Sequence, residues 1–213
     1  MLSKEFFNKL TEEAESYSES GGSHEFSHTE RVYNLALKIS ENENVDLDVL
    51  KAAVLLHDIA RKKEDDGECE CHAEEGSKMA EKILKDMNFP EDKISKVVYA
   101  IKVHRHSKNI FPETKEAAIL QDADRLDALG AITIARMFSS GGKAGIPLYN
   151  PRQKETSNTY NGQKSTIEGF HKKILKITPE TFKTKKAKEI AKGRYEYVEN
   201  FIKRFIKEWE GKE

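Results

Sequence analysis

The feature that most constrains this chain is an apolar run that ends in a histidine and an aspartate. Residues Ala52–Leu56 are all apolar and lead directly into His57 and Asp58, which predicts a buried helix that delivers both side chains at its end. Burying an imidazole beside a carboxylate costs free energy unless each group finds a hydrogen bond or a cation. The doublet therefore indicates a polar site at the end of a core helix, with a divalent metal ion as the simplest partner.

Two other segments can supply further ligands to such a site. Adjacent helical residues point about 100° apart, so an ion shared by the doublet lies beyond the helix end and needs ligands from elsewhere. His28 lies upstream and Asp124 downstream, each within an apolar pattern of helical spacing. The order histidine, His-Asp doublet, aspartate closely resembles the HD superfamily of metal-dependent phosphohydrolases.

The resemblance covers nearly the whole chain, from about residue 20 to residue 210, and is to the small, single-domain bacterial and archaeal branch of the superfamily. Beyond the doublet it is carried by residues 72–76, 101–105 and 121–132. It implies an all-α HD-domain helical bundle. It also implies four metal ligands: His28, His57, Asp58 and Asp124.

The hydrophobic pattern independently favours an all-α fold. No stretch alternates apolar and polar residues over the length of a strand, and apolar residues recur at helical spacing. We expect helices over residues 3–17, 26–39, 46–60, 72–87, 90–104, 112–138, 165–177 and 181–209, with a polar loop over 61–71. The helix over 112–138 is either interrupted at Asp122–Asp124 or continuous through it. We predict one HD domain over residues 1–213, with a long polar loop at about 139–165 and a basic C-terminal segment, 166–213.

Composition excludes several classes of protein. With 37% hydrophobic and 34% charged residues, the chain is too polar for a membrane protein and too apolar for a disordered one. The first residues lack the apolar stretch of a signal peptide, so we expect a cytoplasmic protein with no membrane partner. Basic and aromatic residues are not interleaved as in nucleic-acid-binding domains. We expect no nucleic acid partner, and a monomer or homodimer.

The residue types also limit the metal. Neutral imidazoles together with carboxylates favour Mn²⁺, Ni²⁺, Co²⁺, Fe²⁺ or Zn²⁺ over Ca²⁺, which prefers oxygen ligands; we favour Mn²⁺. Four protein ligands on a six-coordinate ion leave two positions, one for water and one for a phosphate oxygen. This arrangement predicts hydrolysis of a phosphoester or phosphoanhydride without a covalent intermediate.

Two further histidines lie between the doublet and Asp124. His72 and His104 are candidates for phosphate contact, for general acid catalysis, or for binding a second metal ion. Two-metal members of the superfamily use two such histidines, so that alternative stays open. We expect a single ion, because small single-domain relatives generally look that way.

Two acidic residues complete the candidate catalytic set. Arg61 stands where many relatives place an aspartate, so Glu75 or Glu64 could take over the proton-handling role. Asp127 follows Asp124 by one helical turn and could orient a ligand or cap a helix.

Basic and aromatic residues indicate where a substrate would bind. Lys63 and Arg105 could neutralise phosphate oxygens. Lys143 and Tyr149 belong to a basic region, residues 140–175, that could cover a base and a triphosphate.

We therefore predict hydrolysis of nucleoside or deoxynucleoside triphosphates to monophosphate and pyrophosphate, as small relatives look like nucleotide pyrophosphohydrolases. One alternative is a phosphatase or phosphodiesterase that acts on nucleoside monophosphates or cyclic nucleotides. Another is a non-catalytic HD protein that binds metal or nucleotide.

Overall fold

The described part of the chain is entirely helical. The computed structural model describes residues 1–18, 26–151 and 165–212, and every regular element in them is an α-helix or a short 3₁₀ helix, which confirms the all-α prediction. The chain divides into two compact units, Met1–Arg125 and Leu126–Glu213, which are taken in turn. That residues 1–213 form one domain stays a prediction.

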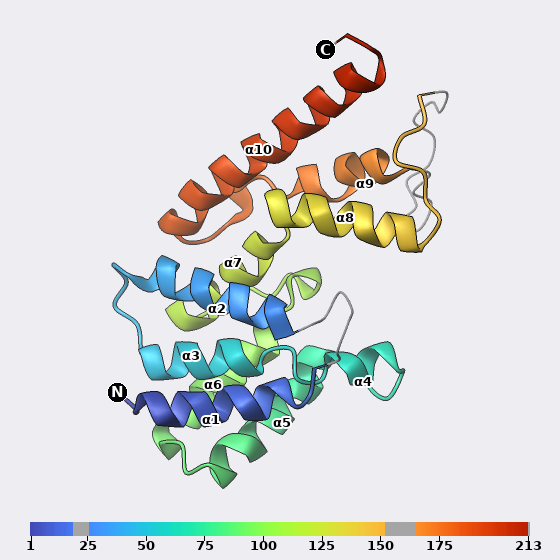
Figure 1. Cartoon of the computed structure of the whole chain (residues 1–213). Helices are drawn as coiled ribbons and strands as arrows, with labels where there is room; N and C mark the ends of the chain where they lie inside the picture. The colour runs from blue at the N-terminus through green and yellow to red at the C-terminus, as the bar shows by residue number, and fades with distance from the viewer. Residues whose placement is uncertain (19–25, 152–164, 213) are drawn as a thin grey trace. The chain divides into compact units, whose positions relative to one another are not determined.

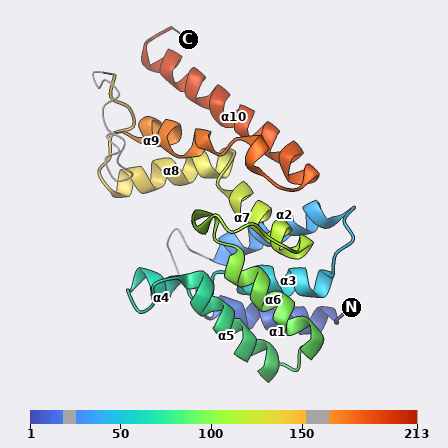
Figure 2. The same cartoon turned by 180° about the vertical axis from the view of Figure 1, so that it is seen from behind.

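The first unit is built around an apolar central helix. Its helices are α1 (Lys4–Glu15), α2 (Phe26–Ser40), α3 (Leu47–Leu56), α4 (Arg61–Asp65), α5 (His72–Asp86), α6 (Glu91–Val103), the 3₁₀ turn η1 (His106–Lys108) and most of α7 (Lys115–Asp127). Eight of the ten α3 residues are buried, because α3 contacts α1, α2, α5 and α6. Figure 1 shows α3 between α1 and α2, and Figure 2 shows α5 beside α6.

Helices α3 and α6 run in the same direction, and both ends of the pair are fixed by polar groups. At their N-terminal ends, Lys93 Nζ of α6 lies 2.9 Å from a carboxylate oxygen of Asp46 and 2.9 Å from one of Asp48. At their C-terminal ends, His57 and His104 are the C-cap residues, with ring centroids 5.1 Å apart. The parallel pair therefore directs two histidines to one place.

Several element boundaries differ from the sequence prediction, and three of the differences have a clear physical meaning. The expected loop after Asp58 contains the single helical turn α4. The expected helix 112–138 is two helices, because Gly130, with φ 92°, adopts a left-handed conformation that ends the helical path.

The predicted polar loop also begins later than expected, because α8 continues to Lys143 through two glycines. A Cβ at Gly141 would lie 2.5 Å from Thr166 Oγ1, so this glycine permits close packing inside a helix and does not mark a loop. Residues 152–164 of the predicted loop lie outside the described part of the chain.

The second unit packs its helices around phenylalanine side chains. It contains α8 (Ala131–Lys143), α9 (Thr166–Lys172), the 3₁₀ turns η2 (Ile174–Lys176) and η3 (Pro179–Thr181), and α10 (Lys185–Trp209). Phe138 of α8 lies with its ring centroid 5.8 Å from that of Phe170 and 5.7 Å from that of Phe205. Across both units, none of the described helices is long and apolar enough to cross a membrane.

The Lys93 contacts make a prediction about acid stability. Burial raises the pKa of Asp46 and Asp48, but hydrogen bonds from Lys93 and from backbone N–H groups outweigh burial and hold both pKa values below the ordinary one. Carboxyls with a lowered folded-state pKa contribute stability above about pH 4 that is lost as the pH falls. Lys93→Met should lower the free energy of unfolding by about 2 kcal/mol near neutral pH, since the Asp48 side chain is only 3% exposed.

Urea denaturation near neutral pH and again at about pH 3 tests this, with the exposed Lys96→Met on the same helix as control. The difference between wild type and Lys93→Met should shrink in acid. An equal difference at both pH values would assign the loss to packing and contradict the electrostatic account.

Candidate functional site

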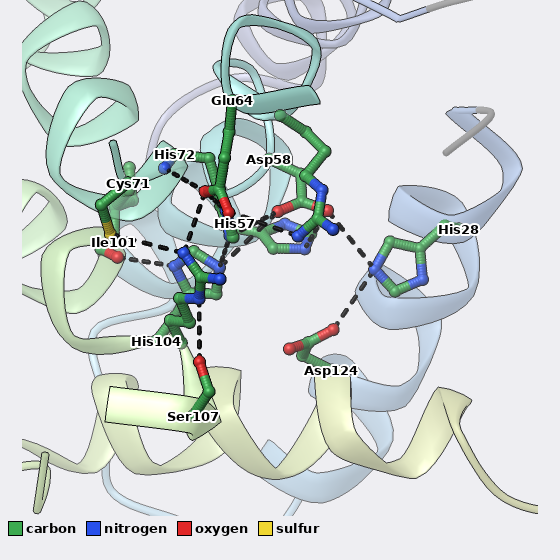
Figure 3. A network of polar contacts seen from close by, with 12 residues as sticks. His28, His57, Asp58, Glu64, Cys71, His72, Ile101, His104, Ser107 and Asp124 are labelled. Carbon is green, nitrogen blue, oxygen red and sulfur yellow. Dashed lines mark hydrogen bonds and ion pairs between the residues drawn. The ribbon is translucent and has the colours of Figure 1, made fainter. Parts of the chain in front are cut away.

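The Asp58 carboxylate lies at the centre of a cluster of histidines, and its two oxygens face different partners (Figure 3). Oδ2 lies 3.8 Å from His57 Nε2 and 3.9 Å from His28 Nε2. His28 Nε2 is in turn 3.3 Å from Asp124 Oδ1. The structure therefore brings together all four residues that the resemblance implied as metal ligands.

The other oxygen of Asp58 faces a second pair of histidines. Oδ1 lies 3.4 Å from His72 Nε2 and 3.6 Å from His104 Nε2, and these two nitrogens are 3.3 Å apart. Figure 3 shows His28 and Asp124 on one side of Asp58 and His72 and His104 on the other. Asp58 is thus shared by two groups with the spacing of metal ligands: His28, His57 and Asp58, and Asp58, His72 and His104.

Helix ends fix the orientation of two of these histidines. His57 Nδ1 lies 2.7 Å from the Val54 carbonyl oxygen, and His104 Nδ1 lies 2.6 Å from that of Ile101. A carbonyl oxygen only accepts hydrogen bonds, so each Nδ1 carries a hydrogen and donates it. Each Nε2 of a neutral ring therefore presents its lone pair to the Asp58 cluster, which is the form that binds metals.

The metal that the sequence predicted fits this arrangement. His57 Nε2 is completely buried and has no hydrogen-bond partner among the described residues, a costly state for a buried polar atom. The Nε2 atoms of His72 and His104 face each other across 3.3 Å, which requires a proton or a cation nearby to offset lone-pair repulsion. Imidazole nitrogens and carboxylate oxygens together form the donor set of a divalent transition metal.

The protonation states of the cluster residues also favour metal binding. Burial lowers the pKa of His57, which opposes a charge on its ring. Burial raises the pKa of Asp58, but the His57 ring and the His104 hydrogen bond outweigh it and hold the pKa well below its ordinary range. Burial also raises the pKa of Asp124, but a hydrogen bond from His28 outweighs burial, so this pKa is lowered too. Both carboxyls are anions near neutral pH.

The pKa values of the two buried histidines of the second group, His72 and His104, are shifted in opposite directions. Burial lowers the pKa of His72. Burial also opposes a charge on His104, but the hydrogen bond to Asp58 and the Asp58 charge outweigh it and raise the pKa of His104. A proton on His104 can therefore occupy the space beside Asp58 Oδ1 that a cation would take. The prediction that only one ion binds stays a prediction, since the donor atoms alone form two groups.

Arg105, a predicted phosphate ligand, lies beside the cluster and contacts protein groups. Its guanidinium lies 2.9 Å from Glu64 Oε2 and 3.8 Å from Cys71 Sγ, and its Nε donates to Ser107 Oγ. Sequence reasoning gave no role in the site to Arg61, whose guanidinium lies 3.4 Å from His72 Nδ1.

Two predicted site residues lie on helices next to the cluster. Lys63 is a half-buried residue of α4, and its backbone carbonyl accepts from Glu68 N–H. Glu75 is on α5, where its Oε2 lies 3.3 Å from Lys78 Nζ. The substrate-binding role of Lys63 and the catalytic role of Glu75 stay predictions.

Three predicted site residues belong to the second unit. Asp127 is buried and pairs with Arg136 at 3.1 Å, an interaction that suits the helix-end role considered for it. Lys143 is exposed at the end of α8. The Tyr149 ring packs edge-on against Trp209, with centroids 5.6 Å apart. Their roles toward a substrate stay predictions.

Comparisons with known proteins agree with this geometry. The HD domain family model matches residues 26–129. The crystal structure of an HD-superfamily hydrolase from Bacillus thuringiensis is 31% identical, with a TM-score of 0.78 over 97% of this chain and 98% of that chain. A predicted HD superfamily hydrolase from an uncultured Thermotogales bacterium is 34% identical, with a TM-score of 0.67 over 97% of this chain and 92% of that one.

A third relative is the uncharacterized protein YpgQ of Bacillus subtilis, 29% identical over 91% of this chain and 87% of its own length. The crystal structure of YpgQ in complex with ADP superposes with a TM-score of 0.71 over 97% of this chain and 100% of that chain. The shared fold, the matching family model and the assembled histidine and aspartate cluster agree, and this chain belongs to the HD superfamily of metal-dependent phosphohydrolases.

Proposed function

We propose that this chain hydrolyses nucleoside or deoxynucleoside triphosphates to the monophosphate and pyrophosphate, with Mn²⁺ as its metal. The observation that carries the metal-dependent chemistry is the division of the cluster around Asp58, in which each carboxylate oxygen faces two imidazole nitrogens. In place of the single ion expected from the sequence, we propose that the two groups hold one ion each and share Asp58.

The solvent-exposed fraction of the side chains differs between the two sides of the cluster. The side chains of His57, His72 and His104 are at most 3% exposed, whereas those of Asp58 and Asp124 are 19% and 28% exposed. A substrate phosphate would therefore approach from the side of Asp124 and Asp58. The buried histidines exclude bulk water from the other side, which strengthens electrostatic interactions there.

A bound divalent metal supplies a Lewis acid for phosphoryl oxygens and lowers the pKa of a coordinated water. The residues of this chain supply the rest. Asp58 and Asp124 are anionic, so they can bind the ions and neutralise part of their charge. His57 and His104 are held by backbone carbonyls, so their rings do not have to reorient when a substrate binds.

The nucleotide substrate is supported by a relative. YpgQ has been crystallised with ADP, and a nucleoside diphosphate shares its base, its sugar and its α and β phosphates with a triphosphate. A phosphatase or a phosphodiesterase would use the same metal cluster on nucleoside monophosphates or cyclic nucleotides, so these are separated by product. A non-catalytic binding protein has no need of two complete ligand groups.

Product identification tests the proposal. Phosphorus NMR after incubation of Mn²⁺-loaded protein with a panel of nucleoside and deoxynucleoside triphosphates should give monophosphate and pyrophosphate. Asp58→Ala should abolish the reaction because it removes the shared carboxylate. Asp86→Ala, which removes an exposed carboxylate at the end of α5, should leave the rate unchanged.

Other outcomes would redirect the assignment. Orthophosphate released in place of pyrophosphate would indicate a phosphatase. Turnover of cyclic nucleotides or monophosphates alone would indicate a phosphodiesterase or nucleotidase. Metal-loaded protein that binds nucleotide and turns over none of these substrates would favour the non-catalytic alternative.

The number of ions gives a second prediction. Wild-type protein should bind two Mn²⁺ per chain, and each of His28→Gln and His104→Gln should weaken one site by more than about 100-fold, because direct ligands matter more than their hydrogen-bond partners. Asp58→Ala should weaken both. Titration calorimetry gives the stoichiometry, and electron paramagnetic resonance detects magnetic coupling between paired Mn²⁺ ions.

A single ion in wild-type protein, still bound with full affinity by His104→Gln, would contradict the two-ion arrangement. It would instead support the alternative in which His72 and His104 contact the substrate.

A further inference from the structure

The short helix α4 places a glutamate, Glu64, beside the cluster. Glu64 has a side chain only 19% exposed, and one of its oxygens, Oε2, lies within hydrogen-bond distance of three nitrogens. These are the His72 backbone nitrogen at 2.7 Å, His72 Nδ1 at 2.6 Å and Arg105 NH1 at 2.9 Å. All the contacts of this oxygen therefore converge on one histidine and one arginine.

His72 needs a partner that the backbone does not provide. His57 and His104 follow the last residues of helices, where free carbonyl groups accept the hydrogen of Nδ1. His72 is the first residue of α5, and a helix begins with free N–H groups, which cannot accept. The preceding N-cap residue, Cys71, makes no side-chain capping bond. The Glu64 carboxylate accepts both from the free N–H group and from the ring.

The contact defines which nitrogen of His72 carries hydrogen. A carboxylate at 2.6 Å requires Nδ1 to be the donor. The Arg61 guanidinium, 3.4 Å from the same nitrogen, only donates and would favour the opposite ring form, but the Glu64 contact is much shorter and outweighs it. Nε2 of His72 is then left with its lone pair directed at Asp58 Oδ1, 3.4 Å away.

We propose that Glu64 is a positioning residue, which fixes His72 with its hydrogen on Nδ1 and so completes the metal-ligand group of Asp58, His72 and His104. This inference deepens the proposed function and rests on it. A carboxylate behind a ligating imidazole also makes the opposite nitrogen a stronger ligand, and loss of such a partner typically costs about 10–100-fold in metal affinity.

Arg105 in turn stabilises the Glu64 carboxylate. Burial raises the pKa of Glu64, but the hydrogen bonds from His72 and the charge of Arg105 outweigh it and lower the pKa to about 2. Arg105 thus keeps the carboxylate anionic while satisfying it. The role predicted for Arg105 as a phosphate ligand would require its guanidinium to be shared with Glu64.

The first test reads the His72 ring directly in metal-free protein. Long-range proton–nitrogen correlation NMR at about pH 8, above the ordinary histidine pKa, should show hydrogen on Nδ1 of His72 in the wild type. Glu64→Ala should give a mixture of the two ring forms. Glu64→Gln, which keeps an acceptor oxygen but loses the charge, should largely restore the wild-type form.

The second test separates the two metal groups. In Mn²⁺ titrations, Glu64→Ala and Glu64→Gln should each weaken one site by about 10–100-fold and leave the other unchanged. Glu68→Ala, at an exposed glutamate a few residues along the chain, should bind both ions like the wild type. Thermal unfolding of the same variants shows whether the change is confined to metal binding.

Hydrogen on Nε2 of His72 in wild-type protein would overturn the proposal even if no variant folded. So would an unchanged ring form and full Mn²⁺ affinity in Glu64→Ala, which would leave Glu64 only a helix cap. If wild-type protein turns over no nucleotide, the proposed function fails, whereas the ring form of His72 in metal-free protein still decides the role of Glu64.

Discussion

The site of the first unit depends on one half-buried carboxylate placed among imidazole nitrogens. Each oxygen of Asp58 faces two Nε2 atoms at 3.4 to 3.9 Å. Anionic oxygens and neutral acceptor nitrogens gathered in a region of low dielectric are unfavourable by themselves. A cation makes the same arrangement favourable. It would explain why the apolar helix α3 leads into His57 and Asp58, two polar groups whose burial would otherwise cost free energy.

Helix direction decides how each histidine is supported. Parallel packing brings the C-terminal ends of α3 and α6 to the cluster, and these ends carry the partial negative charge of the helix dipole. His57 and His104 therefore sit where carbonyl acceptors and the local field both favour a cation. His72 enters from the N-terminal end of α5, where the field is positive and only donors are free. Glu64 offsets both disadvantages at once.

The sequence predicted what depends on local pattern. The apolar run before His57 and the helical spacing along the chain are properties of short segments, so the all-α fold and a polar site at the end of a core helix could be predicted. The ligand set His28, His57, Asp58 and Asp124 came from the resemblance to the HD superfamily. The helix carrying Glu64 could not, because residues 61–65 are all charged and show no apolar period. The contact of Glu64 with Arg105 joins residues 41 positions apart, and it depends on the tertiary packing that brings α4 to the segment after α6. The break at Gly130 was hidden because the apolar pattern continues across it.

Charge balance connects the proposed two-ion cluster to its proposed substrate. Glu64 is compensated by Arg105 at 2.9 Å, so among the residues of the two ligand groups and Asp124 only Asp58 and Asp124 contribute negative charge. Two carboxylates can neutralise one divalent ion, but two ions leave a net positive charge of about two units that the protein ligands do not compensate. Bound water cannot remove this excess without losing a proton, whereas a polyphosphate brings several negative oxygens on adjacent phosphorus atoms. A two-ion cluster with so few carboxylates is therefore better suited to a polyanionic substrate than to a neutral or singly charged one, and a nucleoside triphosphate meets that requirement.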